Sequence, residues 1–232
     1  MKRRKSKEVK VGKVRIGGGA PVVVQGMTKT NPENVRATIE QIKELAQVGA
    51  RIVRIALPTV KAATTLSWIK QRVEVPLVAD IHFNYRIALE AINQGVDKVR
   101  INPGNMGKKE IISVASKAKE KRIPLRIGIN SGSLKKGLLN NNLVQRKVSG
   151  IEDKDYKQII AEVMVKSALD TVALLEREEF RDIVISLKAA DVFTTILAYQ
   201  LISNKVSYPL HLGVTATGPP PQGIVRSSIG IG

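Results

Sequence analysis

The sequence contains no cysteine, few aromatic residues and no long apolar run. With no cysteine among its 232 residues, the chain forms no disulfide and no thiolate-ligated zinc or iron–sulfur site of its own. Aromatic residues make up 3% of the chain and hydrophobic residues 43%, so the expected core is aliphatic, which favours parallel strands buried on both faces. No apolar run approaches the roughly 20 residues of a membrane helix, and the basic N-terminus is not followed by a signal-peptide core. We therefore expect a cytoplasmic protein with no membrane span.

Acidic residues are also scarce. The chain has 20 Asp and Glu against 38 Lys and Arg, a formal net charge of +18, which bears on partners and solubility rather than on fold. Many lysines fall in stretches with helical periodicity, where a solvated surface explains them. A basic run over residues 2–7 suggests nucleic acid as one partner, but Trp68 and the tyrosines are scattered rather than arrayed for base stacking. Attraction of a smaller anion is the other functional explanation.

Short apolar runs bounded by Gly or Pro alternate with longer amphipathic segments, which is typical of repeated β–α units over a parallel sheet. Seven strands are predicted, at Val22–Met27, Ile52–Leu57, Leu77–His82, Val99–Pro103, Leu125–Asn130, Ile183–Lys188 and Leu210–Thr215. Helices are predicted between them, at Val35–Val48, Tyr85–Asn93, Ile111–Lys121, Tyr156–Leu175 and Val192–Ile202.

The number of units favours a barrel. A closed parallel barrel needs eight strands, one more than the seven predicted, whereas a doubly wound sheet would need a Gly-x-Gly-x-x-Gly turn after its first strand, which is missing. The glycines at 17–19 precede that strand and predict an N-terminal hairpin or loop. A polar loop is expected over Gly132–Gly150. The predicted fold is an α/β, TIM-type (β/α)8 barrel truncated after about seven units, with residues 1–232 forming one incomplete barrel domain.

Polar residues occupy alternate positions in the predicted strands. Residues two apart in a strand share a face, and branched apolar residues such as Val99 and Ile101 must face the helices. The intervening polar residues therefore face the barrel interior. This inward set comprises Arg54, Asp80, His82, Arg100, Asn102, Arg126, Asn130, Ser186, Lys188, His211 and Thr215.

The inward cations need a partner, because burying an unpaired charge costs on the order of several kcal/mol. Asp80 is the one acid on the same face, so Arg54, Arg100, Arg126 and Lys188 outnumber it. A bound polyanion would supply the missing charge, and several arginines around one ligand suggest more than one phosphoryl group. Taken singly, these residues have simpler explanations: a structural ion pair for Arg54, a satisfied core histidine for His82 and a rim position for Lys188. Because all four cations lie on the inward face of different strands, an anion site explains them together better than four separate explanations do.

A series of motifs in chain order resembles the 4-hydroxy-3-methylbut-2-enyl diphosphate synthase family. The likeness runs through essentially the whole chain, so it is more specific than any single motif. The motifs are GGGAP at 17–21, VQGMT at 24–28, VADIHF at 78–83, VRINPGN at 99–105, RIGINSGSL at 126–134, SLK at 186–188, HLGVT at 211–215 and SSIG at 227–230.

This resemblance implies a two-electron reductive ring opening of 2-C-methyl-D-erythritol 2,4-cyclodiphosphate, with ferredoxin or flavodoxin as electron donor. It also implies a homodimer in which a barrel holds the cyclic diphosphate and a C-terminal domain carries a [4Fe–4S] cluster on three Cys and one Glu. Because this chain has no cysteine, the resemblance places those ligands beyond Gly232. The 232 residues alone are then expected to bind no cluster and to be inactive.

The resemblance also assigns roles to residues. His82 and Lys188 would be catalytic, with His82 orienting the substrate. Residues that would bind the substrate are Arg54, Asp80, Arg100, Asn102, Arg126, Asn130 and Ser227. No metal ligand is expected within the chain. One departure from the family is Ala216, which stands where the family has a glutamate thought to assist protonation or hydroxyl loss.

Two other classes of function fit parts of the sequence. A pterin-binding or methyl-transfer barrel also uses inward Asp, Asn, Lys and Arg, but it predicts a bicyclic ligand and no cluster. A basic RNA-associated fragment without enzymatic activity is favoured by the N-terminal run and the net charge alone.

Overall fold

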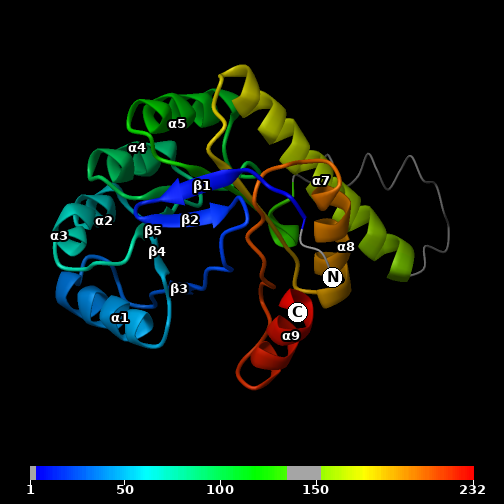
Figure 1. Cartoon of the computed structure of the whole chain (residues 1–232), viewed down its shortest axis with the longest axis horizontal. Coiled ribbons are helices and arrows are strands. Elements are labelled where there is room, and N and C mark those ends of the chain that lie inside the picture. The colour runs from blue at the N-terminus through cyan, green and yellow to red at the C-terminus, as the bar shows by residue number, and fades with distance from the viewer. Residues whose placement is uncertain (1–3, 135–152) are drawn as a thin grey trace.

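A curled sheet of parallel strands forms the centre of the computed structural model, which describes residues 4–134 and 153–232 (Figure 1). Its six strands lie side by side in chain order, as expected for successive β–α units. They are β3 (Gln25–Met27), β4 (Ile52–Ala56), β5 (Leu77–Asp80), β6 (Lys98–Ile101), β7 (Leu125–Asn130) and β8 (Ile183–Lys188). These strands confirm six of the seven predicted, with the ends moved by up to three residues. The predicted loop over Gly132–Gly150 lies outside the described residues from position 135 onward.

The seventh predicted strand, Leu210–Thr215, is reduced to a single bridge between Leu210 and Ile185. The phenol of Tyr199 lies between this segment and β8. It accepts a hydrogen bond from the backbone N–H of Leu187 and donates one to the carbonyl of His211. Because the side chain occupies the place of a direct backbone bond, the ladder is interrupted, although the Thr215 N–H still donates to the carbonyl of Ala189.

Helices cover the outer face of the sheet (Figure 1). They are α1 (Val35–Gln47), α2 (Val60–Thr64), α3 (Leu66–Lys70), α4 (Tyr85–Asn93), α5 (Lys108–Glu120), α7 (Asp153–Arg177) and α8 (Val192–Ser203). A further helix, α9 (Gln222–Ile231), packs against α8, and a 3-10 turn, η1 (Ser131–Ser133), follows β7. The five predicted helices are confirmed to within three residues at each end. The short helices α2 and α3 were not predicted, because neither is long enough to show helical periodicity. No helix in residues 4–134 and 153–232 is long and apolar enough to cross a membrane.

An antiparallel hairpin closes the end of the sheet opposite the strands' carboxyl ends. It consists of β1 (Glu8–Val11) and β2 (Val14–Gly17), which confirms the expected N-terminal hairpin. Val11 and Val14 form a small apolar cluster with Ile52 and Val78, which begin or lie early in their strands. The N–H of Lys7 donates to the carbonyl of Ser207, so the hairpin is also tied to the segment before Leu210.

The alternation along the strands separates two faces. Val53, Ile55, Ile127 and their equivalents belong to the main core cluster with the helices, whereas the inward Ile52 and Val78 pack on the hairpin. Most of the residues that remain on the inner face are polar, as the two-residue period of the strands predicts, and the buried Val184 is an apolar exception. The apolar core on the outer face thus holds the sheet in place, and the polar side chains of the inner face remain available to form a site.

Candidate anion site

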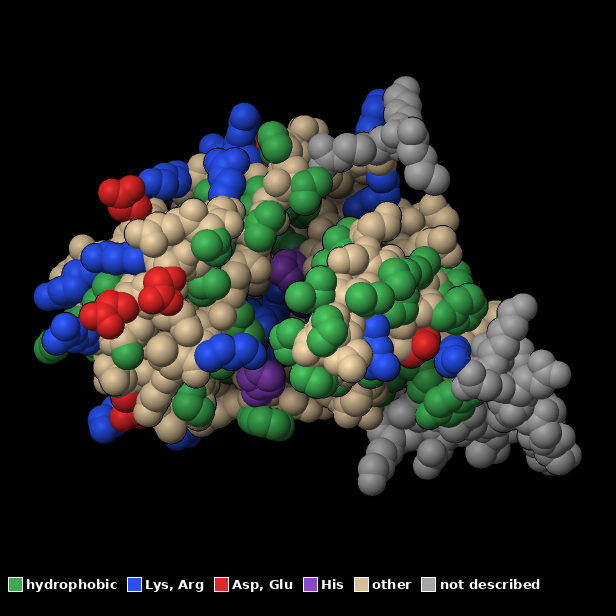
Figure 2. Space-filling model, turned by 90° about the horizontal axis from the view of Figure 1, so that it is seen from below, with side chains coloured by type: hydrophobic (Ala, Val, Ile, Leu, Met, Phe, Trp, Pro, Cys, Tyr) green, Lys and Arg blue, Asp and Glu red, His purple; other side chains and the backbone are tan. Residues whose placement is uncertain are grey.

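A pocket of about 200 Å³ lies toward the carboxyl ends of the strands. Seven of the predicted site residues meet in it, and Figure 2 shows this hollow with Lys, Arg and His side chains gathered inside. The lining residues are Met27, Arg54, Asp80, His82, Arg100, Arg126, Asn130, Ser186, Lys188, Val214 and Thr215. Active sites of parallel barrels are found at this end.

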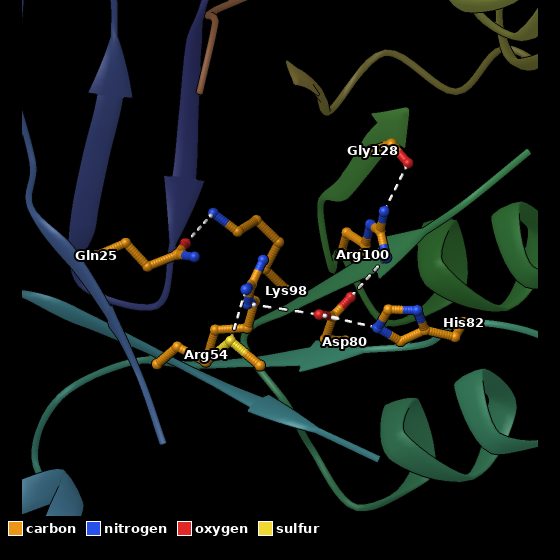
Figure 3. Close-up of polar contacts among 8 residues, drawn as sticks. Gln25, Arg54, Asp80, His82, Lys98, Arg100 and Gly128 are labelled. Atoms are coloured by element: carbon orange, nitrogen blue, oxygen red, sulfur yellow. Dashed lines mark hydrogen bonds and ion pairs between the residues drawn. The ribbon is translucent and has the colours of Figure 1, made fainter. Parts of the chain in front are cut away.

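Asp80 is the carboxylate that ties the cations together (Figure 3). Its Oδ1 lies 3.0 Å from Nη1 of Arg100, and its Oδ2 lies 3.5 Å from Nε of Arg54 and 3.4 Å from Nε2 of His82. Burial by itself would raise the pKa of Asp80, but the contact with His82 and the charges of Arg100 and Arg54 outweigh burial and lower it. Asp80 is therefore ionised at neutral pH and compensates part of the positive charge.

Arg126 is the least compensated of the three arginines in the pocket. Its side chain is 1% exposed, and its Nε and Nη1 atoms have no hydrogen-bond partner among the described residues. Burial lowers the pKa of Arg126 to about 9, and the neighbouring charge of Arg54 acts in the same direction. Because an unsatisfied buried donor costs about 1 to 3 kcal/mol, this guanidinium is suited to receive an acceptor from a ligand.

Lys188 faces the same pocket from the end of β8. Burial and, after it, the charges of Arg126 and Arg54 lower the pKa of Lys188 to about 7. The opposing effect of Asp80 is smaller. His211, also near these cations, has a pKa well below its usual value, because of burial and then of the charge of Arg126. The imidazole of His211 is therefore uncharged at neutral pH.

Two glycines make room for the cations. A Cβ on Gly128 would lie 2.2 Å from Nε of Arg100, and a Cβ on Gly213 would lie 2.8 Å from Nζ of Lys188. The carbonyl of Gly128 also accepts a hydrogen bond from Nη2 of Arg100 at 2.8 Å. A side chain at either position would therefore displace a cation that faces the pocket.

Two predicted substrate-binding residues lie elsewhere. Asn102 is buried after β6, where its Oδ1 accepts a hydrogen bond from the Gly104 N–H, so it shapes a turn. Ser227 lies on α9 and lines a different depression, together with Thr217 and Ile224. Neither residue is among those that line the pocket, and their substrate roles stay predictions.

Three inner-face residues were missed. Met27 lines the pocket and contacts Arg54, and Gln25 accepts a hydrogen bond from Lys98 deeper in the barrel. The signal for Lys98 was present, since it stands two residues before Arg100 and so shares its face. Ala216, where the family glutamate was expected, is exposed and has a left-handed φ of 50°.

Comparison with known families agrees with this geometry. Residues 6–232 match the GcpE TIM-barrel domain. The chain belongs to this family. The barrel fold predicted from the alternation of strands and helices is thereby confirmed, and the observed part is a half-barrel of six parallel strands.

Two curated relatives carry the same name, "4-hydroxy-3-methylbut-2-en-1-yl diphosphate synthase (flavodoxin)". The relative from Thermodesulfovibrio yellowstonii is 50% identical over 233 residues, and that from Clostridium acetobutylicum is 51% identical over 233 residues. In both, the alignment covers 100% of this chain and 63% of the relative. The chain thus spans less than two thirds of the length of these relatives.

Solved structures of other barrels resemble the chain in fold. An N-acetylneuraminic acid synthetase from Leptospira borgpetersenii superposes with a TM-score of 0.62 at 12% identity, covering 97% of this chain and 75% of that one. A dihydropteroate synthase from Stenotrophomonas maltophilia gives 0.57 at 12% identity, covering 90% and 91%. At this identity the likeness is one of fold alone.

The close approach of Gly128 to Arg100 predicts the effect of a single added methyl group. Gly128→Ala should destabilise the chain by about 1 to 3 kcal/mol, the usual cost of overpacking, and should displace Arg100 from Asp80. Gly132→Ala is the matched control, because a Cβ there meets nothing within 4 Å. Denaturant unfolding of both variants measures the difference, and equal stabilities would show that Arg100 is not confined by Gly128.

The position of Asp80 among cations predicts a large effect of neutralising it. Asp80→Asn should lower the free energy of unfolding by about 3 to 5 kcal/mol, because it leaves buried arginines unpaired. Asp170→Asn, on the exposed side of α7, should change it by less than about 0.5 kcal/mol. Since the pKa of Asp80 is lowered on folding, its contribution should be present at neutral pH and disappear as the pH falls below about 4. A pH-independent difference between wild type and Asp80→Asn across that range would contradict this electrostatic role.

Proposed function

We propose that this chain is the substrate-binding barrel of a 4-hydroxy-3-methylbut-2-en-1-yl diphosphate synthase, which opens 2-C-methyl-D-erythritol 2,4-cyclodiphosphate reductively. The observation that carries the proposal is the pocket in which Arg54, Arg100, Arg126 and Lys188 surround one carboxylate, Asp80. A cyclic diphosphate brings the negative charge that this pocket lacks. The name of the curated relatives supports the same substrate class.

The residues of the pocket would have different roles in binding the substrate. Arg126 offers two free donors to phosphoryl oxygens, and Arg54 and Lys188 approach from neighbouring walls of the pocket. Arginine suits this role because its planar fork matches the spacing of phosphate oxygens. Asp80 holds Arg100 in place and lies beside Nε2 of His82, which orients that imidazole toward the substrate. Asn130 adds a neutral donor at the end of β7.

The reduction itself needs a group that these residues do not hold. The chain has no cysteine, and the described residues contain no cluster of His, Asp and Glu able to bind a metal ion. The residues present therefore do not fit a [4Fe–4S] cluster. We place its ligands outside these 232 residues and expect the barrel alone to be inactive. Flavodoxin, named with the relatives, is the proposed electron donor, and the proposed setting is a cytoplasmic homodimer.

The alternative ligands fit the pocket less well. A pterin is a flat bicyclic ring, and the described residues that line the pocket include no Phe, Tyr or Trp against which such a ring could stack. Two of the described N-terminal basic residues, Arg4 and Lys7, make contacts within the chain. Arg4 donates to the carbonyls of Val206 and Tyr208, and Lys7 lies over the Tyr208 ring at 4.5 Å. These contacts weaken the case for RNA binding through that run.

Substrate binding tests the proposal. Arg126→Ala should weaken binding of 2-C-methyl-D-erythritol 2,4-cyclodiphosphate by about 1.5 to 3 kcal/mol, the range for hydrogen bonds to a charged group. Lys119→Ala should have almost no effect, because Lys119 lies on the surface of α5 beside Glu179. Calorimetric titration of both variants gives the two affinities. Equal losses, or no binding to the wild type, would show that the inner cations are not the substrate site.

A further inference from the structure

Lys98 lies inside the barrel below the pocket and has no part in the binding scheme above. It is the first residue of β6, its side chain is 0% exposed, and it shares the inner face with Arg100. Its Nζ donates one hydrogen bond, to Oε1 of Gln25 at 3.4 Å (Figure 3). No carboxylate of the described residues lies within 4.0 Å of this amine. A fully buried lysine without a counter-ion is rare, because lysine is almost never buried unless paired.

The groups that face Lys98 are positive or uncharged. Arg54 on β4 and Arg126 on β7 act on it as like charges, and the uncharged imidazole of His211 faces the same cations. The neighbouring strand β3 contributes the amide of Gln25.

The other surrounding elements add no compensating charge. The hairpin contributes Val11 and Val14, and β5 contributes Val78, which pairs with Lys98 in the sheet register. Asp80 is two residues further along β5 and is engaged by Arg100 and Arg54. The carboxylate of Asp97, next to Lys98 in the chain, binds Lys70.

Such surroundings disfavour a charged ammonium when the pocket is empty. Burial lowers the pKa of Lys98 to about 7, and the charges of Arg126 and Arg54 act in the same direction. A polyanion bound against those two arginines would reverse the local field. An opposite charge nearby favours the protonated form of an amine.

We propose that Lys98 is a buried proton acceptor coupled to the anion site, mostly neutral at pH 8 when the pocket is empty and protonated when a phosphorylated ligand is bound. The proton comes from solvent and returns to solvent on release, and no covalent bond changes. Lys98 acts through the field at Arg126 and Arg54 rather than by touching the ligand. The positive charge of the barrel thereby rises when the ligand arrives and falls when it leaves. This role rests on the proposed function of the pocket as a phosphate site.

Proton uptake on binding tests the role of Lys98 directly. The ligand is trimetaphosphate, a cyclic phosphate that stays fully ionised near neutral pH, titrated at pH 8 in buffers of different ionisation enthalpy. The wild-type chain should take up protons, with shares from Lys98 and Lys188. Lys98→Met should lose the share of Lys98 and still bind, whereas Lys119→Met should match the wild type. Uptake in Lys98→Met equal to that of the wild type would overturn the proposal.

The same coupling predicts a pH dependence of affinity. Because protonation accompanies binding, trimetaphosphate should bind more tightly as the pH falls from 8 to 7. The protonation of Lys98 should contribute about a fivefold increase in affinity over this range, and Lys98→Met should lack that increase. If Lys98→Met does not fold, carbon-13 NMR of the lysine side chains in the wild type decides. One buried lysine should titrate near neutrality in the empty chain and at higher pH with trimetaphosphate bound. If all lysines other than Lys188 titrate at their ordinary values in the empty chain, the proposal is wrong.

The outcomes separate this proposal from the one before it. No binding of trimetaphosphate to the wild type would defeat the phosphate pocket and, with it, the role of Lys98. Binding without a contribution from Lys98 would defeat the present proposal alone. Binding of trimetaphosphate but not of 2-C-methyl-D-erythritol 2,4-cyclodiphosphate would defeat the proposed enzymatic function and leave the coupling in place.

Discussion

The excess of buried positive charge on the inner face of the sheet is the constraint on which the rest of the structure depends. One carboxylate, Asp80, faces Arg54, Arg100, Arg126 and Lys188, and Lys98, deeper in the barrel, adds a further buried amine. Charges buried without partners destabilise a fold by amounts comparable to its whole stability. The barrel tolerates them because the lysines can lose their protons, because Asp80 stays ionised, and because the outer face is packed with aliphatic side chains. The remaining imbalance is the basis of the affinity for an anion that we propose for the pocket.

The backbone is arranged to keep these charges in position. Gly128 and Gly213 lack the side chains that would collide with Arg100 and Lys188. Tyr199 bridges β8 to the segment at His211, which fixes the strand that ends in Lys188. The N-terminal hairpin covers the opposite end of the barrel with valines, so the polar interior opens toward the pocket. Packing, turn chemistry and electrostatics therefore serve the same site.

Much of this arrangement follows from the sequence, because a parallel strand has a period of two and the charged residues fall on one parity. That period predicted the inward face and the cluster of Arg54, Asp80, Arg100, Arg126 and Lys188, whereas the repeated β–α units predicted the barrel. It could not predict the interrupted seventh strand, because the Tyr199 phenol comes from a helix and replaces a backbone bond. The same rule includes Lys98, but the predicted strand begins at Val99 and therefore leaves Lys98 out, whereas β6 begins at Lys98. Parity also placed Asn102 on the inner face, but β6 ends at Ile101 and the Asn102 side chain turns back to the Gly104 N–H. Ser227 rests on a motif alone, and a motif does not report which side of a helix a side chain faces.

The most direct measurement is a crystal structure of the chain with 2-C-methyl-D-erythritol 2,4-cyclodiphosphate bound. We expect phosphoryl oxygens within hydrogen-bonding distance of Nε or Nη1 of Arg126 and of Nζ of Lys188, with the pairing of Arg100 and Asp80 retained. Arg126 is the critical residue, because its buried donors have no partner in the described residues. A diphosphate bound on α9 or at the basic N-terminus, with both donors of Arg126 still unpaired, would contradict the proposal that the inner cations bind the substrate.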